Sequence, residues 1–201
     1  MRSCEVFVNR SGVIVLAGFL IALLAGWFLF PSILYRSEPQ PMQFSHKTHA
    51  GEKVGMSCTD CHATSADGRF QGIPLMAKCA ECHSAQLGES ASEKVLVEEY
   101  VTPGKEIPWL VYQRQPDNAF FPHAVHTRLD SVTCGTCHGT HQESDSLKPY
   151  QENRISGYSR EIWGENISGI SSNSWEGMKM SRCVECHAEH GRRDGCIDCH
   201  K

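Results

Sequence analysis

The chain has 201 residues, a formal net charge of -4, 11 Cys and 11 His. The negative charge excludes the electrostatic case for nucleic-acid binding, which needs a basic surface. Cysteine at this frequency is far above ordinary usage, so disulfides, metal sites or a covalent cofactor must account for it.

The N-terminal part of the sequence predicts a membrane-spanning helix. No charged residue occurs between Arg10 and Arg36, and 25 helical residues span roughly 37 Å, more than a hydrocarbon core of about 30 Å. The run is longer than the apolar core of a cleaved signal peptide, and its small residues lie too deep for a cleavage site. We therefore expect a cytoplasmic tail at residues 1–10 and an uncleaved signal anchor at residues 11–35. Arg2 and Arg10 both lie before the span. Positive charge on this side favours a single-pass bacterial inner-membrane protein with its N-terminus in the cytoplasm and the rest of the chain in the periplasm.

After a predicted linker at residues 36–43, one pattern occurs five times and contains every cysteine that follows the anchor. The five Cys-x-x-Cys-His sequences are Cys58, Cys61 and His62; Cys79, Cys82 and His83; Cys134, Cys137 and His138; Cys183, Cys186 and His187; and Cys196, Cys199 and His200. This is the attachment sequence of haem c, in which two thiols form thioethers to the porphyrin and the histidine ligates the iron. Zinc, redox or disulfide use of paired cysteines does not need a histidine at this place. We therefore predict five covalently bound haems.

The same haems account for a shortage of apolar residues. From Arg36 onward 57 of 166 residues are apolar, and ten of these are the motif cysteines, which leaves 47. That number is small for a self-sufficient hydrophobic core. We expect stacked haems to form the interior, with a mostly irregular and α-helical polypeptide wrapped around them.

Six further histidines are candidates for the second axial ligand of the irons: His46, His49, His123, His126, His141 and His190. Four of them form two matching Phe-x-His-x-x-His sequences, which begin at Phe44 and Phe121 and precede a haem motif by eight or nine residues. Histidines three residues apart share one face of a helical turn yet diverge enough to serve different irons. Closure of each iron by two histidines suits electron transfer and leaves no site for a substrate.

Six candidates for five irons leave one histidine over. The extra histidine is either solvated or ligates one additional haem that has no cysteine pair of its own. A methionine is an alternative ligand at one iron: Met56, Met76, Met178 or Met180.

The motifs divide into a dihaem module at residues 44–88 and a trihaem module at residues 119–201, joined by a connector at residues 89–118 without ligands. The connector is acidic, and two β-branched segments around its Thr-Pro-Gly turn, 94–101 and 107–112, predict a β-hairpin. Such a hairpin is either a docking element or a plain spacer. Inside the second module a run rich in Gly, Ser and Asn, residues 164–177, predicts a loop.

The Phe-x-His-x-x-His and Cys-x-x-Cys-His combination resembles the class III and cytochrome c7 family of small multihaem cytochromes. The stretch from Pro108 to His126 is more specific, together with residues 134–139 and 178–183. It resembles the membrane-anchored cytochrome subunit of the alternative complex III and quinone reductase complex family, over roughly residues 10–201. The resemblance implies a class III/c7-like fold with one transmembrane helix. It also implies electron exchange with a soluble periplasmic cytochrome c and an iron–sulfur/molybdopterin-like subunit, while a polytopic membrane subunit binds the quinone.

The same resemblance implies which haem each of the six spare histidines would ligate. His46 and His123 would ligate the haems of their own modules, at Cys58–His62 and Cys134–His138. His49 and His126 would reach across to other haems. The two single residues, His141 and His190, would serve the remaining irons.

Three functions are compatible with these features. The first is a non-catalytic electron-transfer subunit of a respiratory, quinone-linked complex, and we expect this one. The second is a stand-alone membrane-anchored quinol dehydrogenase cytochrome that feeds a periplasmic reductase. The third, a reductase of nitrite or a sulfur oxyanion, needs one iron with an open position, and the surplus of histidine argues against it.

Overall fold

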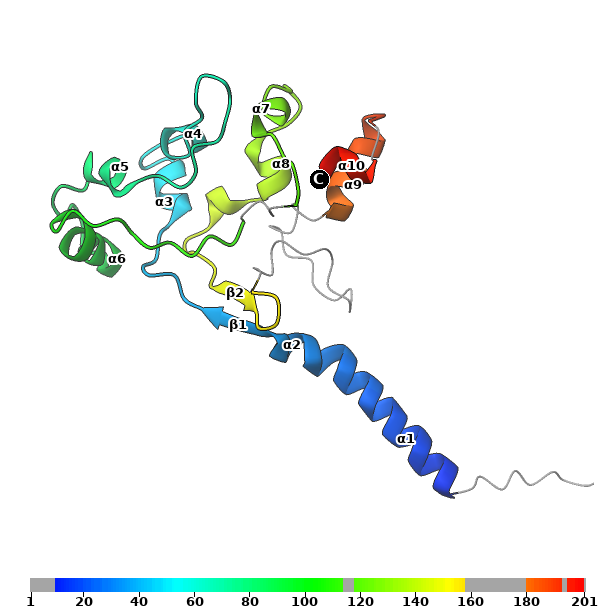
Figure 1. The fold of residues 1–201 in the computed structure, drawn as a ribbon. Coiled ribbons are helices and arrows are strands. Elements are labelled where there is room, and N and C mark those ends of the chain that lie inside the picture. Colours follow the sequence, from blue (N-terminus) through cyan, green and yellow to red (C-terminus); the bar gives the residue numbers. More distant parts are fainter. Residues whose placement is uncertain (1–9, 114–117, 158–179, 193–194, 201) are drawn as a thin grey trace, which may run out of the picture.

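The computed structural model describes residues 10–113, 118–157, 180–192 and 195–200 (Figure 1). An apolar helix comes first. It consists of α1 (Arg10–Leu24), the π-helical turn η1 (Ala25–Leu29) and α2 (Phe30–Leu34), and it projects away from the rest of the molecule (Figure 1). The part from Arg10 to Leu29 has 20 residues, about 30 Å of helix, and none of them is buried. Its length and composition make it a candidate membrane anchor.

A two-stranded sheet joins this helix to the remaining chain. Strand β1 (Tyr35–Glu38) follows α2 directly and pairs antiparallel with β2 (Tyr150–Asn153), with Tyr35 opposite Asn153. Arg36 Nη2 lies 3.0 Å from the Glu152 carboxylate across the pair. The prediction of a linker at residues 36–43 is therefore wrong in its first part, because a distant segment supplies the partner strand.

The buried hydrophobic core of the described residues is very small. It contains Met42, Leu96 and Ile107, which are 7–8% exposed, and the partly buried Tyr100 and Trp109 pack against it. No described side chain is less than 2% exposed. A cluster of three residues cannot offset the conformational entropy of a chain this long. This agrees with the expectation that other groups fill the interior.

The connector forms a helix in place of the predicted β-hairpin. Residues 94–101 lie in α6 (Ala91–Val95) and the π-helical turn η2 (Leu96–Val101), and residues 107–112 form no strand. The prediction is wrong because Leu96 and Tyr100, four residues apart, pack against the small core from one side of a helix. This tertiary contact outweighs the β-propensity of the valines.

Gln40 holds the connector to the segment after β1, and its removal is expected to destabilise the fold. Its side chain is 6% exposed, donates to the Leu110 carbonyl at 2.8 Å and accepts from the Leu110 N–H at 3.0 Å. Gln40→Ala leaves both Leu110 backbone groups without these bonds. The free energy of unfolding should fall by about 2 kcal/mol. Thermal unfolding of the haem-loaded protein should shift down by roughly 4–8 °C. Gln71→Ala, at an exposed position, is the control, and an equal shift in both variants would contradict the assignment.

Eight short elements carry the predicted ligands: α3 (His46–Ala50), α4 (Cys58–Cys61), α5 (Met76–Ala80), α7 (His123–His126), α8 (Cys134–His138), the 3-10 turn η3 (His141–Glu143), α9 (Met180–Glu189) and α10 (Cys196–Cys199). Helices α3 to α6 lie together on one side, and α7 to α10 lie on the other side (Figure 1). Gly68, at φ +83, lies against Ala124 of α7, so closely that a Cβ there would be 2.8 Å from the Ala124 Cβ. The two parts therefore touch directly. The predicted loop at 164–177 lies outside the described residues.

Candidate functional site

The haem motifs adopt the local structure that their spacing requires. In three of them the N–H of the residue before the first cysteine donates to the side chain three positions later. These bonds are Ser57 to Asp60 at 2.6 Å, Thr133 to Thr136 at 3.0 Å and Gly195 to Asp198 at 3.0 Å. Such an N-terminal cap starts a helical turn at the first cysteine. The two thiols and the following histidine are then presented from one turn.

The cysteines are available for thioether formation. All ten motif cysteines are free thiols. In the described ranges, no group of three His, Cys, Asp or Glu side chains converges as a zinc site would need. Burial raises the pKa of the Cys61, Cys79 and Cys137 thiols, which keeps them protonated at neutral pH.

Thiols of different motifs lie next to one another. Burial raises the pKa of Cys58, and the neighbouring Cys134 thiol raises it further through its charge and a hydrogen bond. Burial raises the pKa of Cys79, Cys137 and Cys183, and a nearby thiol of another motif raises each of them further: Cys61 for Cys79, Cys186 for Cys137, and Cys137 and Cys199 for Cys183. The five motifs therefore follow one another in space, in the order second, first, third, fourth and fifth.

The two Phe-x-His-x-x-His sequences have the same geometry, as their repetition predicts. Phe44 stacks on His49 at 4.4 Å between ring centres and meets His46 edge-on at 4.9 Å. Phe121 stacks on His126 at 4.5 Å and meets His123 edge-on at 4.9 Å. The phenylalanine thus fixes the orientation of both imidazoles.

Hydrogen bonds leave the outer nitrogen of the second histidine in each pair available for a metal. His49 Nδ1 lies 2.8 Å from the Ser45 carbonyl oxygen, and His126 Nδ1 lies 3.0 Å from that of Pro122. A carbonyl oxygen only accepts, so Nδ1 carries the proton and the lone pair is on Nε2. This is the arrangement of a histidine that ligates a metal through Nε2.

Three of these histidines lie opposite a motif histidine at the separation that a shared iron requires. Two metal–nitrogen bonds of about 2 Å, plus the distance from each nitrogen to its ring centre, give roughly 6 Å between ring centres. The observed separations are 6.1 Å for His49 and His83, 6.4 Å for His123 and His138, and 6.1 Å for His126 and His187. The first and second histidine of the α7 pair thus face different motifs, as the resemblance implies.

Burial lowers the pKa of three of these histidines, which keeps His46, His123 and His138 neutral at physiological pH. Burial lowers the pKa of His123, and the nearby His126 lowers it further. Burial is also the main cause of the lowered pKa of His46 and His138. Since a metal binds the neutral form, burial prepares these side chains for ligation.

The remaining candidates are placed differently. His46 lies opposite His141 at 6.4 Å, although the resemblance implies His62 as its partner. His190 is exposed at the end of α9, where its Nδ1 donates to the Cys186 carbonyl at 2.8 Å. The fifth motif packs on the segment before α7, because His200 Nδ1 lies 3.2 Å from the Asn118 carbonyl oxygen.

Several residues that support the motif histidines have no signal in the sequence. Glu93 lies 2.8 Å from His83 Nδ1, and Gln113 Oε1 lies 2.8 Å from His138 Nδ1. Phe70 stacks between His62 at 5.9 Å and His123 at 5.0 Å, and so links the first motif to the third. None of the three follows a motif spacing, because each comes from a separate loop or helix. A carboxylate beside His83 and an amide beside His138 give these two imidazoles different basicity.

Replacement of Glu93 is expected to raise the reduction potential of the haem at His83. The Leu87 N–H lowers the pKa of Glu93 most, followed by the Gly88 N–H and His83, so the side chain is a carboxylate at neutral pH. A carboxylate that accepts from Nδ1 increases the basicity of the imidazole and favours the oxidised iron. Glu93→Gln should raise that potential by roughly 60 mV, equivalent to about 1.4 kcal/mol per electron.

A spectroelectrochemical titration measures this shift. The control is Glu98→Gln, which removes the same charge from an exposed position on the same connector helix. An equal shift in the control would mean that overall charge, and not the bond to His83, sets the potential.

Comparison with known proteins places the chain among multihaem cytochromes. The family model of cytochrome c3 matches residues 48–151, just over half of the chain. The chain is also 40% identical over 200 residues to the "Menaquinone reductase, multiheme cytochrome c subunit" of Nitratidesulfovibrio vulgaris strain Hildenborough. That alignment covers 92% of this chain and 87% of the relative.

Proposed function

Because this chain belongs to the cytochrome c3 family, and to the family of the menaquinone reductase multihaem cytochrome subunit, we propose that it relays electrons in a quinone-linked respiratory complex. It is an electron-transfer subunit rather than a catalytic enzyme, and it carries covalently bound haems c. In our proposal the haems number five, and electrons pass between a soluble periplasmic cytochrome c and the iron–sulfur and quinone-reactive subunits. The observation that carries this proposal is the row of motifs with histidine pairs at iron-sharing distance.

The side chains of this protein have three tasks in such a relay. The ten motif thiols would hold the porphyrins, and each motif histidine would ligate the iron. His49, His123 and His126 lie opposite His83, His138 and His187, and they would help to hold the second, third and fourth haems. His190 is then left for the fifth haem. When bound, each haem supplies a one-electron iron couple.

Contacts between the motifs support one order of transfer along the row. Helix α3 connects the second motif to the start of the dihaem module, since its His49 faces His83. The stacked ring of Phe70 lies between the first and third motifs, and α7 bridges the third and fourth through His123 and His126. The fifth motif packs against Asn118 just before α7. The second and fifth haems would therefore be the two ends of the relay, where electrons enter and leave.

The soluble partner would be basic and would dock at the end formed by the second haem. Helix α6 and the turn η2 lie beside His83 through its bond with Glu93, and they expose Glu98 and Glu99. Two propionates on each haem add to the net charge of -4. Complementary potentials of this kind accelerate the encounter of two redox proteins.

The helix from Arg10 to Leu34 would anchor the subunit with its N-terminus in the cytoplasm and its haem domain in the periplasm. The β1–β2 pair follows the helix without a spacer. It would hold the haem domain close to the membrane, within reach of a polytopic subunit. The dihaem and trihaem modules at 44–88 and 119–201 would then be consecutive parts of one relay.

Purification of the tagged chain from its own membranes in mild detergent tests the proposal. We expect an iron–sulfur subunit and a polytopic subunit to co-purify, and the complex to exchange electrons between a basic periplasmic cytochrome c and a menaquinone analogue. The isolated chain should exchange electrons with the cytochrome alone. Oxidation of menaquinol by the isolated chain would contradict the proposal and support a stand-alone quinol dehydrogenase.

A further inference from the structure

One histidine pair has the separation of a shared iron but contains no motif histidine. His46 at the start of α3 and His141 at the start of η3 are 6.4 Å apart between ring centres. This equals the separation of His123 and His138, where a haem motif supplies one partner. The positions four and one before His46 hold Met42 and Ser45, so no cysteine pair precedes it.

The position before His141 likewise offers no attachment. Thr140 stands directly before it, and Cys137 belongs to the third motif. A porphyrin between these two imidazoles would therefore be held by its iron and its surroundings alone, without a thioether.

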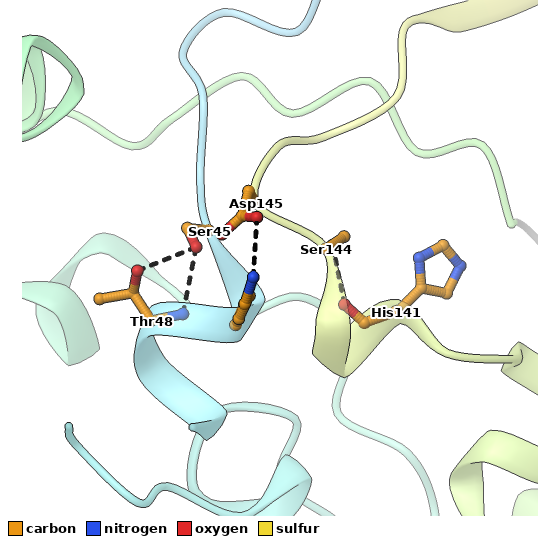
Figure 2. A network of polar contacts seen from close by, with 6 residues as sticks. Ser45, Thr48, His141, Ser144 and Asp145 are labelled. Atoms are coloured by element: carbon orange, nitrogen blue, oxygen red, sulfur yellow. Dashed lines mark hydrogen bonds and ion pairs between the residues drawn. The ribbon is translucent and has the colours of Figure 1, made fainter. Parts of the chain in front are cut away.

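The two histidines are held in place by a polar network between α3 and η3. The Lys47 N–H donates to the Ser144 carbonyl at 3.1 Å, and Lys47 Nζ lies 3.2 Å from the Asp145 carboxylate. Ser45 caps α3 by accepting from the Thr48 N–H, while Ser144 donates to the His141 carbonyl at 2.7 Å (Figure 2). Neither imidazole takes part in these bonds. The network fixes the backbone at both ends of the pair.

The surroundings of the pair suit a haem with propionates. Burial lowers the pKa of His141 to about 4, with further contributions from Lys148 and His46, so its imidazole is neutral. His46 Nδ1 is buried and has no hydrogen-bond partner. The Tyr112 ring lies 6.3 Å from that of His141, and the buried Lys148 ammonium lies 4.4 Å above the centre of the Tyr112 ring. An aromatic wall and a buried cation offer packing for a porphyrin and a counter-charge for a carboxylate.

We propose that His46 and His141 ligate a sixth haem, which is bound without covalent attachment. The proposal rests on the haem-binding character of the chain but not on the proposed relay. It uses two of the six spare histidines and leaves His49, His123, His126 and His190 for the five motif irons, so the iron at His62 would take a ligand other than histidine, such as the methionine considered for one iron. It places the additional haem between the dihaem module and the start of the trihaem module.

Acid–acetone extraction of the full-length haem-loaded protein tests this, because the solvent removes haem that lacks thioethers and leaves haem c on the chain. We expect one haem in the extract for every five retained, as measured by pyridine haemochrome spectra of both fractions. In the His141→Ala variant the extracted haem should be lost while the retained haem stays unchanged. His141→Met, which offers a thioether sulfur to the iron, should retain the extractable haem with a shifted absorption spectrum.

The matched control is Gln142→Ala, which changes an exposed neighbour on the same turn and should leave the extract unchanged. An extract of the native protein without haem would overturn the proposal. So would a His46→Ala variant that gains a high-spin signal at constant total haem, because His46 would then cap one of the covalent haems. The retained fraction reports separately on the five attachment motifs, so its failure would count against the proposed function and not against this site.

Discussion

A chain that cannot attach the central haem is expected to lose its cooperative fold. The variant is Cys134→Ser with Cys137→Ser, which removes both thioethers of the third motif. That motif lies in the middle of the row, with Cys58 of the first motif on one side and Cys186 of the fourth on the other. The described residues bury only three hydrophobic side chains, so nothing else replaces the lost interior. The loss should exceed ~5 kcal/mol, which is comparable to the whole stability of a typical domain.

Thermal unfolding followed by far-UV circular dichroism measures this effect, with disappearance of the sigmoidal transition as the expected result. The same double substitution in the terminal motif, Cys196→Ser with Cys199→Ser, should leave a transition at reduced temperature, because that haem has neighbours on one side. Cys4→Ser makes the same chemical change outside the motifs and should have no effect. A central variant that unfolds like the native protein would show that side chains, and not haems, form the core.

Methionine at either position of the α7 pair is expected to raise the potential of one haem, and a different haem in each case. His123 faces His138 and His126 faces His187. Exchange of one histidine ligand for methionine raises the potential of an iron. The reduction potential should rise by on the order of 0.1–0.3 V, which lies within the range of ~0.8 V over which axial ligands set the potential of haems. In a spectroelectrochemical titration, His123→Met and His126→Met should each move one component, and the double variant should move two.

Val125→Met is the matched control. It introduces the same side chain between the two histidines, at a position that is 59% exposed, and should leave every component in place. If both histidine variants moved the same component, the α7 pair would serve one iron and not two.

The sequence was sufficient to predict the local structure where the interacting residues are close together along the chain. A haem motif has its ligands within five positions, and each Phe-x-His-x-x-His sequence has its ring contacts within six. Local capping and stacking then reproduce the expected geometry, as for Phe121 with His126 and Phe44 with His49. The apolar helix was equally clear, because an uncharged apolar run of this length matches the thickness of a bilayer.

The sequence was insufficient to predict the structure of a segment whose packing partner is far away along the chain. Nothing near Arg36 indicates that Glu152 lies opposite it, so the start of the predicted linker is in fact a strand. Leu96 forms a helix because it packs on Met42 and Ile107, which residues 94–101 alone do not indicate.

The same limit applies to the site. Glu93 reaches His83, and His141 reaches His46, only through the packing of α6 and η3. The number of candidate histidines was known from the sequence, but for some of them it was not known which imidazole lies opposite.

The most direct test of the central claim, that five covalent haems are the interior of this protein, is the intact mass of the full-length chain under denaturing conditions. We predict the mass of the polypeptide plus five haems, with no species that carries fewer. A mass reduced by two hydrogens per cysteine pair would indicate disulfides, and a missing haem mass at any motif would likewise contradict the claim.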